Sequence, residues 1–340
     1  MNSPFAKNDI KIAVIGGGTG SFAMLTALKS RTKQLAAIVN MVDDGGSTGI
    51  LRDELGTLPS GDVRQCLVAL SDSPKVRNLF DYRFEEGTFE GHSFGNILLT
   101  ALEKVCGSFS EAVATASEIL RINGVVIPAT LDDVRLKMEW SDVSTILHGE
   151  RVIDSNYFKY DPRKATLSLV PSALANPMAI SAIEQADMIV ISPGDLYTSL
   201  GPLLIIKGIA EALKRTDALC VYVSNLVTKS GQTTGFDVSD HASEIERFVG
   251  APFIDYVLYN QQIPNRKILK KYIKEGAALV KADKSKFDLA SYKTIAGNFL
   301  GKMADTKKYD KLILKTRSLI RHDSEAVADA LIDLYSKIKK

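Results

Sequence analysis

The chain has 340 residues, of which 45% are hydrophobic, and its 42 Lys and Arg against 40 Asp and Glu give a net charge of +2. This length suits one large α/β domain with an insertion, or two domains, and the composition is that of an ordinary soluble globular protein. A charge so close to zero argues against nucleic acid or an anionic membrane surface as a partner. Any anionic ligand must therefore be held locally.

The cysteines and the apolar runs indicate a cytoplasmic protein. Cys66 and Cys220 lie in apolar segments far from each other and from Cys106, as expected for core thiols, so neither a disulfide nor a zinc site is predicted. No apolar run approaches the roughly 20 residues that cross a bilayer.

Strands and helices alternate along the first third of the chain. The run IKIAVI (10–15) predicts a buried strand, a helix follows over 21–30, and AAIVNMV (36–42) predicts the second strand. A loop is expected over 43–61. Helices are then expected at 63–71, 74–84, 92–106 and 110–122.

The pattern changes at about residue 125 and returns at 176. Three segments with partial alternation, 125–140, 144–153 and 165–172, predict antiparallel strands of a β-rich insertion at about 125–172. Asn176 and Pro177 are suited to begin the helix that follows, and Asp323 to cap the last one. The other expected elements are strands at 188–192, 219–225, 255–260 and 277–283, and helices at 176–186, 201–215, 239–249, 266–276 and 324–338. The prediction is one Rossmann-like α/β domain over 1–340, doubly wound around a mainly parallel sheet.

The first strand ends in the glycine loop Gly16-Gly17-Gly18-Thr19-Gly20-Ser21. Such a loop lets backbone N–H groups and a helix N-terminus approach a phosphate without an intervening Cβ. It fits the dinucleotide fingerprint only loosely, and a turn needed only for packing is the alternative.

The second strand is followed by the more unusual sequence VDDGGSTGILRDELG (42–56), in which the adjacent acidic residues Asp43 and Asp44 directly precede two glycines. Asp43, Asp44 and Asp62 could hold a hydrated Mg²⁺ that bridges phosphates, or act as catalytic groups. Arg52, Arg64, Ser47 and Thr48 could hold a second anionic group. A surface loop with solvated charges is the alternative, and an NAD site would need only one acidic residue here.

Later loops GHSFGN (91–96), SPGDLYTSLGP (192–202) and SNLVTKSGQTTG (224–235) are also rich in glycine or hydroxyl groups. Because ligands of open α/β sheets bind beyond the carboxyl ends of the strands, these loops should converge on one site. His92 and His322 are interpreted as hydrogen-bonded structural residues, and His148 and His241 carry no signal. No activated nucleophile is evident from spacing.

The motifs IAVIGGGTG, VDDGGSTG, LPSGDVRQCLVAL, GHSFGNILL, PATLDDV, SPGDLYTS, VYVSNLVTKSGQT and LIRHD, in this order, resemble the YvcK/CofD-like family, particularly the bacterial branch labelled gluconeogenesis factor. The resemblance runs from about Ile10 to the last helix. It implies a Rossmann-like core that binds a UDP-sugar such as UDP-N-acetylglucosamine and a regulatory role in cell shape and wall precursor supply. The related archaeal branch implies the alternative, a transferase that moves phospholactate from a guanylated donor to a deazaflavin acceptor.

The resemblance also points to individual ligand-binding residues and shows where this sequence departs from the bacterial motifs. It points to Tyr272 and Arg321 for the base and ribose, while Ile50, Ser60, Gln65 and Asp195 stand where the bacterial motifs usually have Arg, Pro, Asn and Ser. The partners expected are a nucleotide diphosphate ligand and a second copy of the chain, with Mg²⁺ as the one candidate cofactor. The complete set of candidate ligand-binding residues is Gly17, Gly18, Thr19, Gly20, Asp43, Asp44, Gly45, Ser47, Arg52, Asp62, Arg64, Asn96, Gly194, Leu196, Thr198, Asn225, Tyr272 and Arg321.

Overall fold

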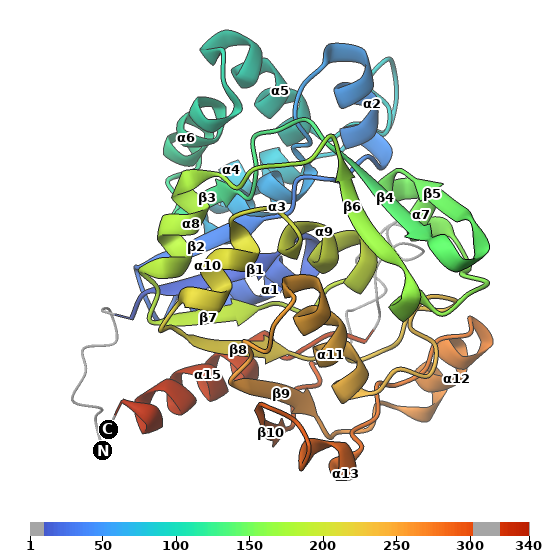
Figure 1. Ribbon diagram of the computed structural model, residues 1–340. Helices are drawn as coiled ribbons and strands as arrows, with labels where there is room; N and C mark the ends of the chain where they lie inside the picture. The colour runs from blue at the N-terminus through green and yellow to red at the C-terminus, as the bar shows by residue number, and fades with distance from the viewer. Residues whose placement is uncertain (1–9, 302–319, 340) are drawn as a thin grey trace.

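A computed structural model describes residues 10–301 and 320–339 of the chain. Its centre is a seven-stranded parallel sheet in the order β10-β9-β8-β7-β1-β2-β3 (Figure 1). The strands are β1 (Ile12–Gly16), β2 (Leu35–Val39), β3 (Val125–Pro128), β7 (Met188–Ile191), β8 (Leu219–Val223), β9 (Tyr256–Asn260) and β10 (Lys293–Gly297). The predicted Rossmann-like α/β fold is confirmed.

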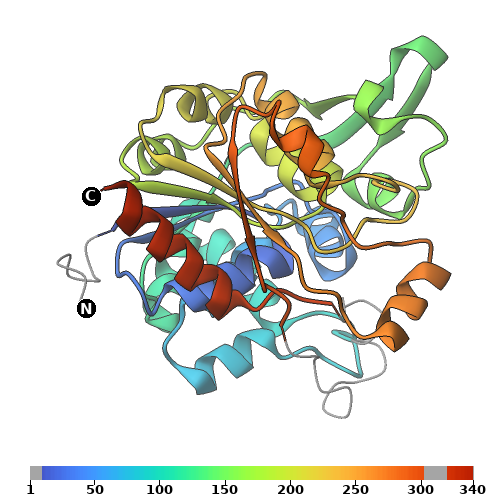
Figure 2. The same ribbon diagram turned by 90° about the horizontal axis from the view of Figure 1, so that it is seen from below.

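Helices cover both faces of the sheet because successive strand residues point to opposite sides. Along β1, Ile12 and Val14 pack into one core while Ala13 and Ile15 pack into the other. One face carries α1 (Gly18–Leu28), α3 (Gly61–Leu70), α6 (Phe109–Leu120) and α15 (Ser324–Ile338), and Figure 2 shows α15 alongside α1. The other face carries α8 (Pro177–Glu184), α9 (Gly201–Leu204), α10 (Ile209–Arg215) and α11 (Val238–Val249). Further helices are α2 (Gly46–Leu55), α4 (Pro74–Asp81), α5 (Phe94–Cys106), α7 (Glu150–Ser155), α12 (Arg266–Lys274) and α13 (Lys284–Phe287).

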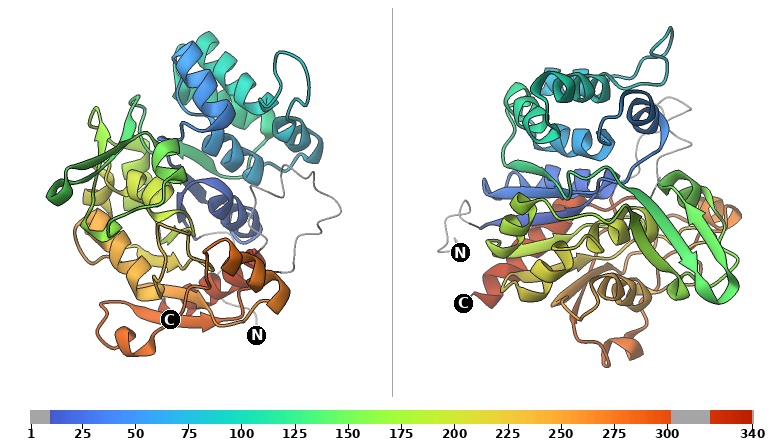
Figure 3. Two further views of the ribbon diagram at one scale, coloured as in Figure 1. Left: turned by 90° about the vertical axis from the view of Figure 1, so that its right-hand side faces the viewer. Right: turned by 45° about the horizontal axis from the view of Figure 1, so that its top comes forward.

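The β-rich insertion forms a separate antiparallel sheet, as predicted, although with narrower limits. Its strand order is β5 (Thr145–His148), β4 (Arg135–Trp140) and β6 (Thr166–Val170), and the β4–β5 hairpin projects beyond the main sheet (Figure 3). The expected first strand of the insertion belongs instead to the main sheet, because β3 pairs in parallel with β2. Residues 150–153, expected as a strand, form the start of α7.

Three further predictions were wrong. The expected loop 43–61 contains α2, whose buried face includes Ser47, Thr48 and Arg52, so it lacks the apolar periodicity that reveals a helix. The helix expected over 201–215 is divided into α9 and α10 near Gly208, which has a φ of +106°. Residues 277–283 make only an isolated bridge, and the edge strand is β10, a half-exposed segment with little apolar pattern.

The predicted caps of α8 and α15 are confirmed. Asn176 accepts a hydrogen bond from the backbone N–H of Met178 at 3.0 Å, and Asp323 accepts one from Ala326 at 3.1 Å. The predicted core thiols Cys66 and Cys220 are buried. Residues 302–319 lie outside the described residues. Within residues 10–301 and 320–339, no helix combines the length and apolar character needed to cross a bilayer.

Candidate functional site

The winding of the sheet reverses at β1, and this point defines the candidate site. From β1 the chain continues to β2 and β3 on one side, and it later returns to β7 on the other side of β1. The carboxyl ends of these strands are aligned, with Gly16 opposite Val39 and Ile15 opposite Ile191. Ligands of open α/β sheets bind at such a reversal. The loops after β1, β2 and β7 therefore meet at one edge, as the sequence predicted.

The glycine loop after β1 serves both packing and access. A Cβ on Gly20 would lie 1.7 Å from the carbonyl oxygen of Pro193, and one on Gly16 would lie 2.2 Å from Ser192 Oγ. These glycines let the β1 and β7 loops approach each other. Gly18 differs, because its φ is +62° and a Cβ there would meet no atom closer than Asp62 Oδ1, at 4.0 Å. Within the loop, Gly18 is thus the position where a ligand has room beside the backbone.

Asp62, in the first turn of α3, is hydrogen-bonded to this loop. Its Oδ1 accepts a hydrogen bond from the Gly18 N–H at 2.9 Å, and a Cβ on Gly17 would lie 2.2 Å from its Oδ2. Burial, followed by the charge of Asp43, raises the pKa of Asp62 to about 7. A buried carboxyl with a neighbouring carboxylate is stabilised by a proton or by a cation.

Two further acidic groups share this environment. Asp43 accepts the Gly45 N–H at 3.0 Å, and burial raises its pKa. Burial, followed by the charge of Asp43, raises the pKa of Glu150 to about 8. Glu150 was not predicted, because its segment was interpreted as a strand. Its position after His148 and Gly149 provided no motif that could have revealed it.

Asp44 lies near this acidic group, and its charge adds to the effect of burial in raising the pKa values of Asp43 and Glu150, but its carboxylate is hydrogen-bonded elsewhere. Its carboxylate accepts the backbone N–H groups of Glu150 at 3.1 Å and Arg151 at 2.7 Å, and lies 3.5 Å from Arg135 Nη1. It therefore caps the N-terminus of α7. In the part of the chain that the structure describes, no three His, Cys, Asp or Glu side chains are placed to hold a metal ion. The binding of a hydrated Mg²⁺ by Asp43, Asp44 and Asp62 together stays a prediction.

We expect Asp44→Ala to destabilise the protein by about 1 kcal/mol, the typical loss for a helix cap. Asp44→Asn should lose less, because its amide oxygen can still accept one of the two N–H groups. Urea denaturation of both variants measures the difference. Equal stability of Asp44→Ala and the wild type would contradict the capping role.

The two arginines expected to bind an anion are engaged within the protein. Arg52 is only 3% exposed, pairs with Asp133, and donates to the carbonyl oxygen of Val134 at 2.5 Å. Arg64 donates to Asn96 Oδ1 at 2.9 Å and to Asp81 at 2.5 Å. Because α2 and α3 direct them inward, this placement does not support direct phosphate contacts from either arginine.

Hydroxyl and amide groups connect α2 to α5. The Asn96 Nδ2 group lies 3.4 Å from both Ser47 Oγ and Thr48 Oγ1, and Ser47 Oγ lies 3.0 Å from His92 Nδ1. His92 is thus hydrogen-bonded, as expected. His322 is bonded to the carbonyl oxygen of Ser224 at 3.1 Å, and burial lowers its pKa to about 4.

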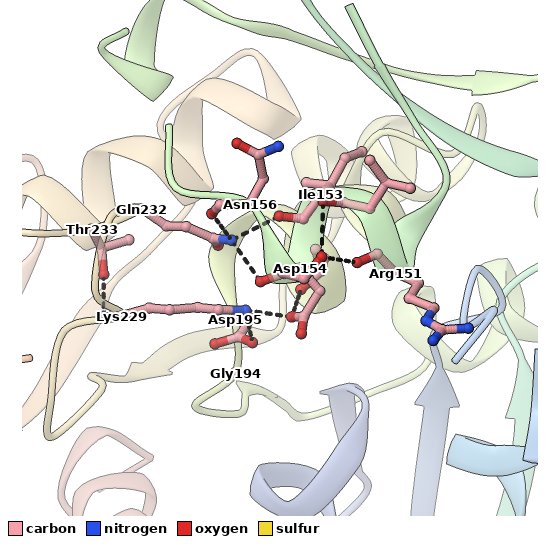
Figure 4. Close-up of polar contacts among 12 residues, drawn as sticks. Arg151, Ile153, Asp154, Asn156, Gly194, Asp195, Lys229, Gln232 and Thr233 are labelled. Carbon is pink, nitrogen blue, oxygen red and sulfur yellow. Dashed lines mark hydrogen bonds and ion pairs between the residues drawn. The ribbon is translucent and has the colours of Figure 1, made fainter. Parts of the chain in front are cut away.

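A lysine-centred network lies beside the β7 loop (Figure 4). Lys229 Nζ contacts Asp195 at 2.8 Å and also pairs with Asp154, while Thr198 Oγ1 lies 3.2 Å from Asp154. Gln232 Nε2 donates to backbone oxygens at the end of α7, 2.8 Å from that of Ile153. With Asp44 at its other end, α7 is thus fixed between the loops that follow β2 and β8.

The signal for this network in the sequence was only indirect. Lys229 lies in the loop 224–235, which was singled out for its glycines and hydroxyls, and Asp195 lies in 192–202. Asp154 had no signal. Asn40 was also missed, because it was counted within the second strand. Its Nδ2 donates to the carbonyl oxygen of Thr198 at 3.3 Å.

Residues 12–300 match the protein family described as 2-phospho-L-lactate transferase CofD. The chain belongs to the CofD family. A relative from Clostridium acetobutylicum is 39% identical over 95% of this chain and 69% of its own length. The Bacillus subtilis protein named gluconeogenesis factor is 36% identical over 95% of this chain and 98% of its own length. A crystal structure of a Bacillus halodurans protein has a TM-score of 0.86 and 35% identity, and covers 95% of this chain and 99% of that one.

The departures from the bacterial CofD-like motifs have visible consequences. Asp195 stands where the bacterial motifs usually have Ser, and its carboxylate is ion-paired with Lys229. Ile50 is 46% exposed on α2, so an arginine there would reach solvent. The sequence change at 195 is thus compensated by a cation within the chain.

Other candidates in the β7 and β8 loops have structural contacts. Asn225 Nδ2 donates to the carbonyl oxygen of Gly194 at 2.9 Å, which ties the two loops together. Leu196 and Thr198 are buried. Thr19, by contrast, is exposed at the first turn of α1.

Tyr272 and Arg321, the two positions expected from CofD-like relatives to recognise the base, come from distant segments that meet. Tyr272 on α12 packs with Leu226 and Ile320, and its hydroxyl accepts the Ile320 N–H at 3.2 Å. This contact brings Tyr272 beside the residue that precedes Arg321. Since the ring is buried, a stacking role for it stays a prediction.

Proposed function

We propose that this CofD-family protein binds a UDP-sugar at the β1–β7 edge and has a regulatory role in cell shape and wall precursor supply. The observation that carries the proposal is the opening at Gly18, where the first turn of α1 can approach a diphosphate without steric obstruction. The names of the relatives, including the Bacillus subtilis gluconeogenesis factor, support a metabolic regulator.

A magnesium ion could be held by two of these carboxylates instead of three. Mg²⁺ is usually held by one or two carboxylates together with substrate phosphates and water. Asp43 and Asp62 would supply the carboxylates. Burial raises the pKa of Asp43, and burial followed by the charge of Asp43 raises the pKa of Asp62. The ion would neutralise both the carboxylates and the ligand phosphates. Asp44 has no part in this arrangement.

A transferase is the second candidate function, and the same acidic groups favour it. A carboxylate with a pKa near 7 can accept a proton from an attacking hydroxyl at neutral pH. In that reaction, the acceptor hydroxyl would form a new bond to phosphorus while the guanylate oxygen leaves. Incubation with a guanylated phospholactate donor and a deazaflavin acceptor, followed by mass spectrometry, tests this function directly.

A thermal-shift panel separates the ligand classes. UDP-N-acetylglucosamine or UDP-glucose should raise Tm by a few degrees, because a ligand at 100 times its Kd adds about 2.7 kcal/mol to stability. GDP and NAD should have smaller effects. A shift with GDP alone would favour the transferase, and a shift with NAD alone would favour an oxidoreductase.

We expect Tyr272→Ala and Arg321→Ala each to weaken UDP-sugar binding about tenfold, equivalent to about 1.4 kcal/mol. The double variant should lose less than the sum, because the two residues would share one ligand pose. Titration calorimetry on the four proteins measures this coupling. Tyr272→Phe separates ring contact from the hydrogen bond to Ile320, and Tyr335→Ala on α15 is the control. Additive losses, or normal binding by either single variant, would place these residues outside a common pocket.

A further inference from the structure

The β-rich insertion delivers one side chain to the candidate site. Glu150 is the first residue of α7, and its backbone N–H is held by Asp44 at 3.1 Å. The preceding residue, Gly149, has a φ of +90°, and a Cβ there would lie 3.1 Å from Asp44 Oδ2, so a glycine lets the insertion approach the loop after β2 closely. At the other end of the helix, Asp154 is paired with Lys229 (Figure 4). Because both ends of α7 are fixed, Glu150 has a defined place beside the site.

The carboxyl group of Glu150 lies across the start of α2 from that of Asp43. A Cβ on Gly45 would lie 3.3 Å from Asp43 Oδ1 and 4.0 Å from Glu150 Oε2, so both acids border the same point. The other oxygen of Asp43 is directed toward Gly61, where a Cβ would lie 2.6 Å from Oδ2, and Asp62 is the next residue. After burial, the charge of Asp43 is the main cause that raises the pKa of both Asp62 and Glu150. The three carboxyl groups thus form a row that leads from the glycine loop through Asp43 to the insertion.

Glu150 is the member of this row that the protein leaves without a partner. Its carboxyl group is half-buried, yet no hydrogen bond or ion pair engages it within residues 10–301 and 320–339. By contrast, Asp62 and Asp43 each accept the backbone N–H of a glycine. Asn40, whose side chain contacts Asp62, has a buried Oδ1 that also accepts no hydrogen bond in the described part of the chain. Polar groups removed from water in this way are stabilised when a ligand supplies the missing partner.

The order of groups along the row indicates which part of a ligand would meet Glu150. The opening at Gly18 and the N-terminus of α1 are suited to a diphosphate, at one end of the row. Asp43 separates this end from Glu150, so Glu150 would meet the group attached beyond the diphosphate. A third phosphate there would be repelled by the neighbouring carboxylates. The hydroxyl groups of a sugar carry no charge and can hydrogen-bond to a carboxyl oxygen.

We propose that Glu150 forms a hydrogen bond with a hydroxyl group of the sugar, so that the insertion selects a nucleotide sugar over the free nucleoside diphosphate. The inference rests on the proposed function, because it assigns one part of the same ligand. In this arrangement the loops after β1 and β7 hold the diphosphate, and α7 recognises the group attached to it. A site built to bond a hydroxyl rejects ligands that lack it, because its own polar group then stays unpaired.

Titration calorimetry on the full chain compares UDP with UDP-N-acetylglucosamine and UDP-glucose. Glu150→Ala should weaken binding of the UDP-sugars at least about tenfold and change the affinity for UDP less than about twofold, because UDP has no group that reaches position 150. Glu150→Gln should fall between Glu150→Ala and the wild type, since its amide can still hydrogen-bond to a hydroxyl group. UTP should bind the wild type more weakly than the UDP-sugars do. Both replacements keep the backbone N–H that Asp44 accepts.

Glu139→Gln, on β4 of the same insertion, is the control and should bind every ligand as the wild type does, because Glu139 is paired with Lys137 at 2.6 Å. Urea denaturation verifies that each variant is folded. Equal losses for UDP and the UDP-sugars in Glu150→Ala, or unchanged binding of the UDP-sugars, would overturn the assignment of Glu150 and leave the proposed function in place. UTP binding as tight as that of the UDP-sugars would also overturn it. A wild type that binds neither UDP nor a UDP-sugar would remove the proposed function and this inference with it.

Discussion

Nucleotide binding should be lost in Gly18→Val and retained in Gly56→Val. The two glycines have nearly the same backbone conformation, with φ of +62° and +61°. A valine at either position is strained, at a cost of about 1–3 kcal/mol. Neither Cβ would collide with the fold, since Gly56 has no atom within 4 Å and Gly18 only Asp62 Oδ1 at 4.0 Å. The variants therefore differ only in location: the valine at position 18 would occupy the space proposed for the ligand phosphates, and the valine at position 56 would not.

The comparison uses urea denaturation for stability and calorimetry with UDP-N-acetylglucosamine for affinity. Similar losses of stability with binding absent only in Gly18→Val support the site. If both variants bind normally, the glycine loop is only a packing turn. If both lose binding, strain in the fold explains the effect and the location of the site is not supported.

The stability of the wild type relative to Asp62→Asn should fall as pH rises from about 4 to 7. The folded pKa of Asp62 is raised to about 7, against 3.8 for an exposed aspartate. In this window the unfolded carboxyl has lost its proton while the folded one retains it, so increasing pH favours unfolding. Below about pH 4 the Asp62 carboxyl is protonated in both the folded and the unfolded state. Above about pH 7 it is ionised in both, and the loss of folding stability is complete. The shift corresponds to at most about 4 kcal/mol at 1.36 kcal/mol per unit.

Urea denaturation at several pH values measures this difference. The amide that replaces the carboxyl in Asp62→Asn keeps an oxygen for the Gly18 N–H but cannot ionise, so subtraction isolates the carboxyl from other titrating groups. Asp72→Asn, at an exposed aspartate, is the control and should show no comparable trend. A constant difference between wild type and Asp62→Asn would mean that Asp62 ionises normally in the fold.

The same carboxyl distinguishes binding with Mg²⁺ from binding without it. A diphosphate beside Asp62 favours its protonated form, so binding near pH 7 should take up protons. A magnesium ion should reverse the sign, because it favours the carboxylate. Calorimetry in two buffers of different ionisation enthalpy measures the number of protons exchanged. No proton exchange in either condition would place the phosphates away from Asp62.

The sequence by itself determined the class of fold and the edge that carries the site. Runs such as IAVI and MIVI are apolar at every position, as expected for short strands that are buried on both faces of a parallel sheet. The glycines after β1 and the acidic pair after β2 then had to lie at the carboxyl ends of neighbouring strands. Their convergence follows from parallel pairing alone.

Only the tertiary structure decided which of these side chains face the site. Asp43 and Asp44 are adjacent in sequence, yet one lies near Asp62 while the other caps α7, because that helix comes from an insertion about 100 residues away. Arg52 was expected to bind an anion, but α2 turns it toward Asp133. Charge and hydrogen-bonding capacity are local properties of a sequence, but the partner that satisfies them is set by packing between distant segments, and no local pattern records that choice.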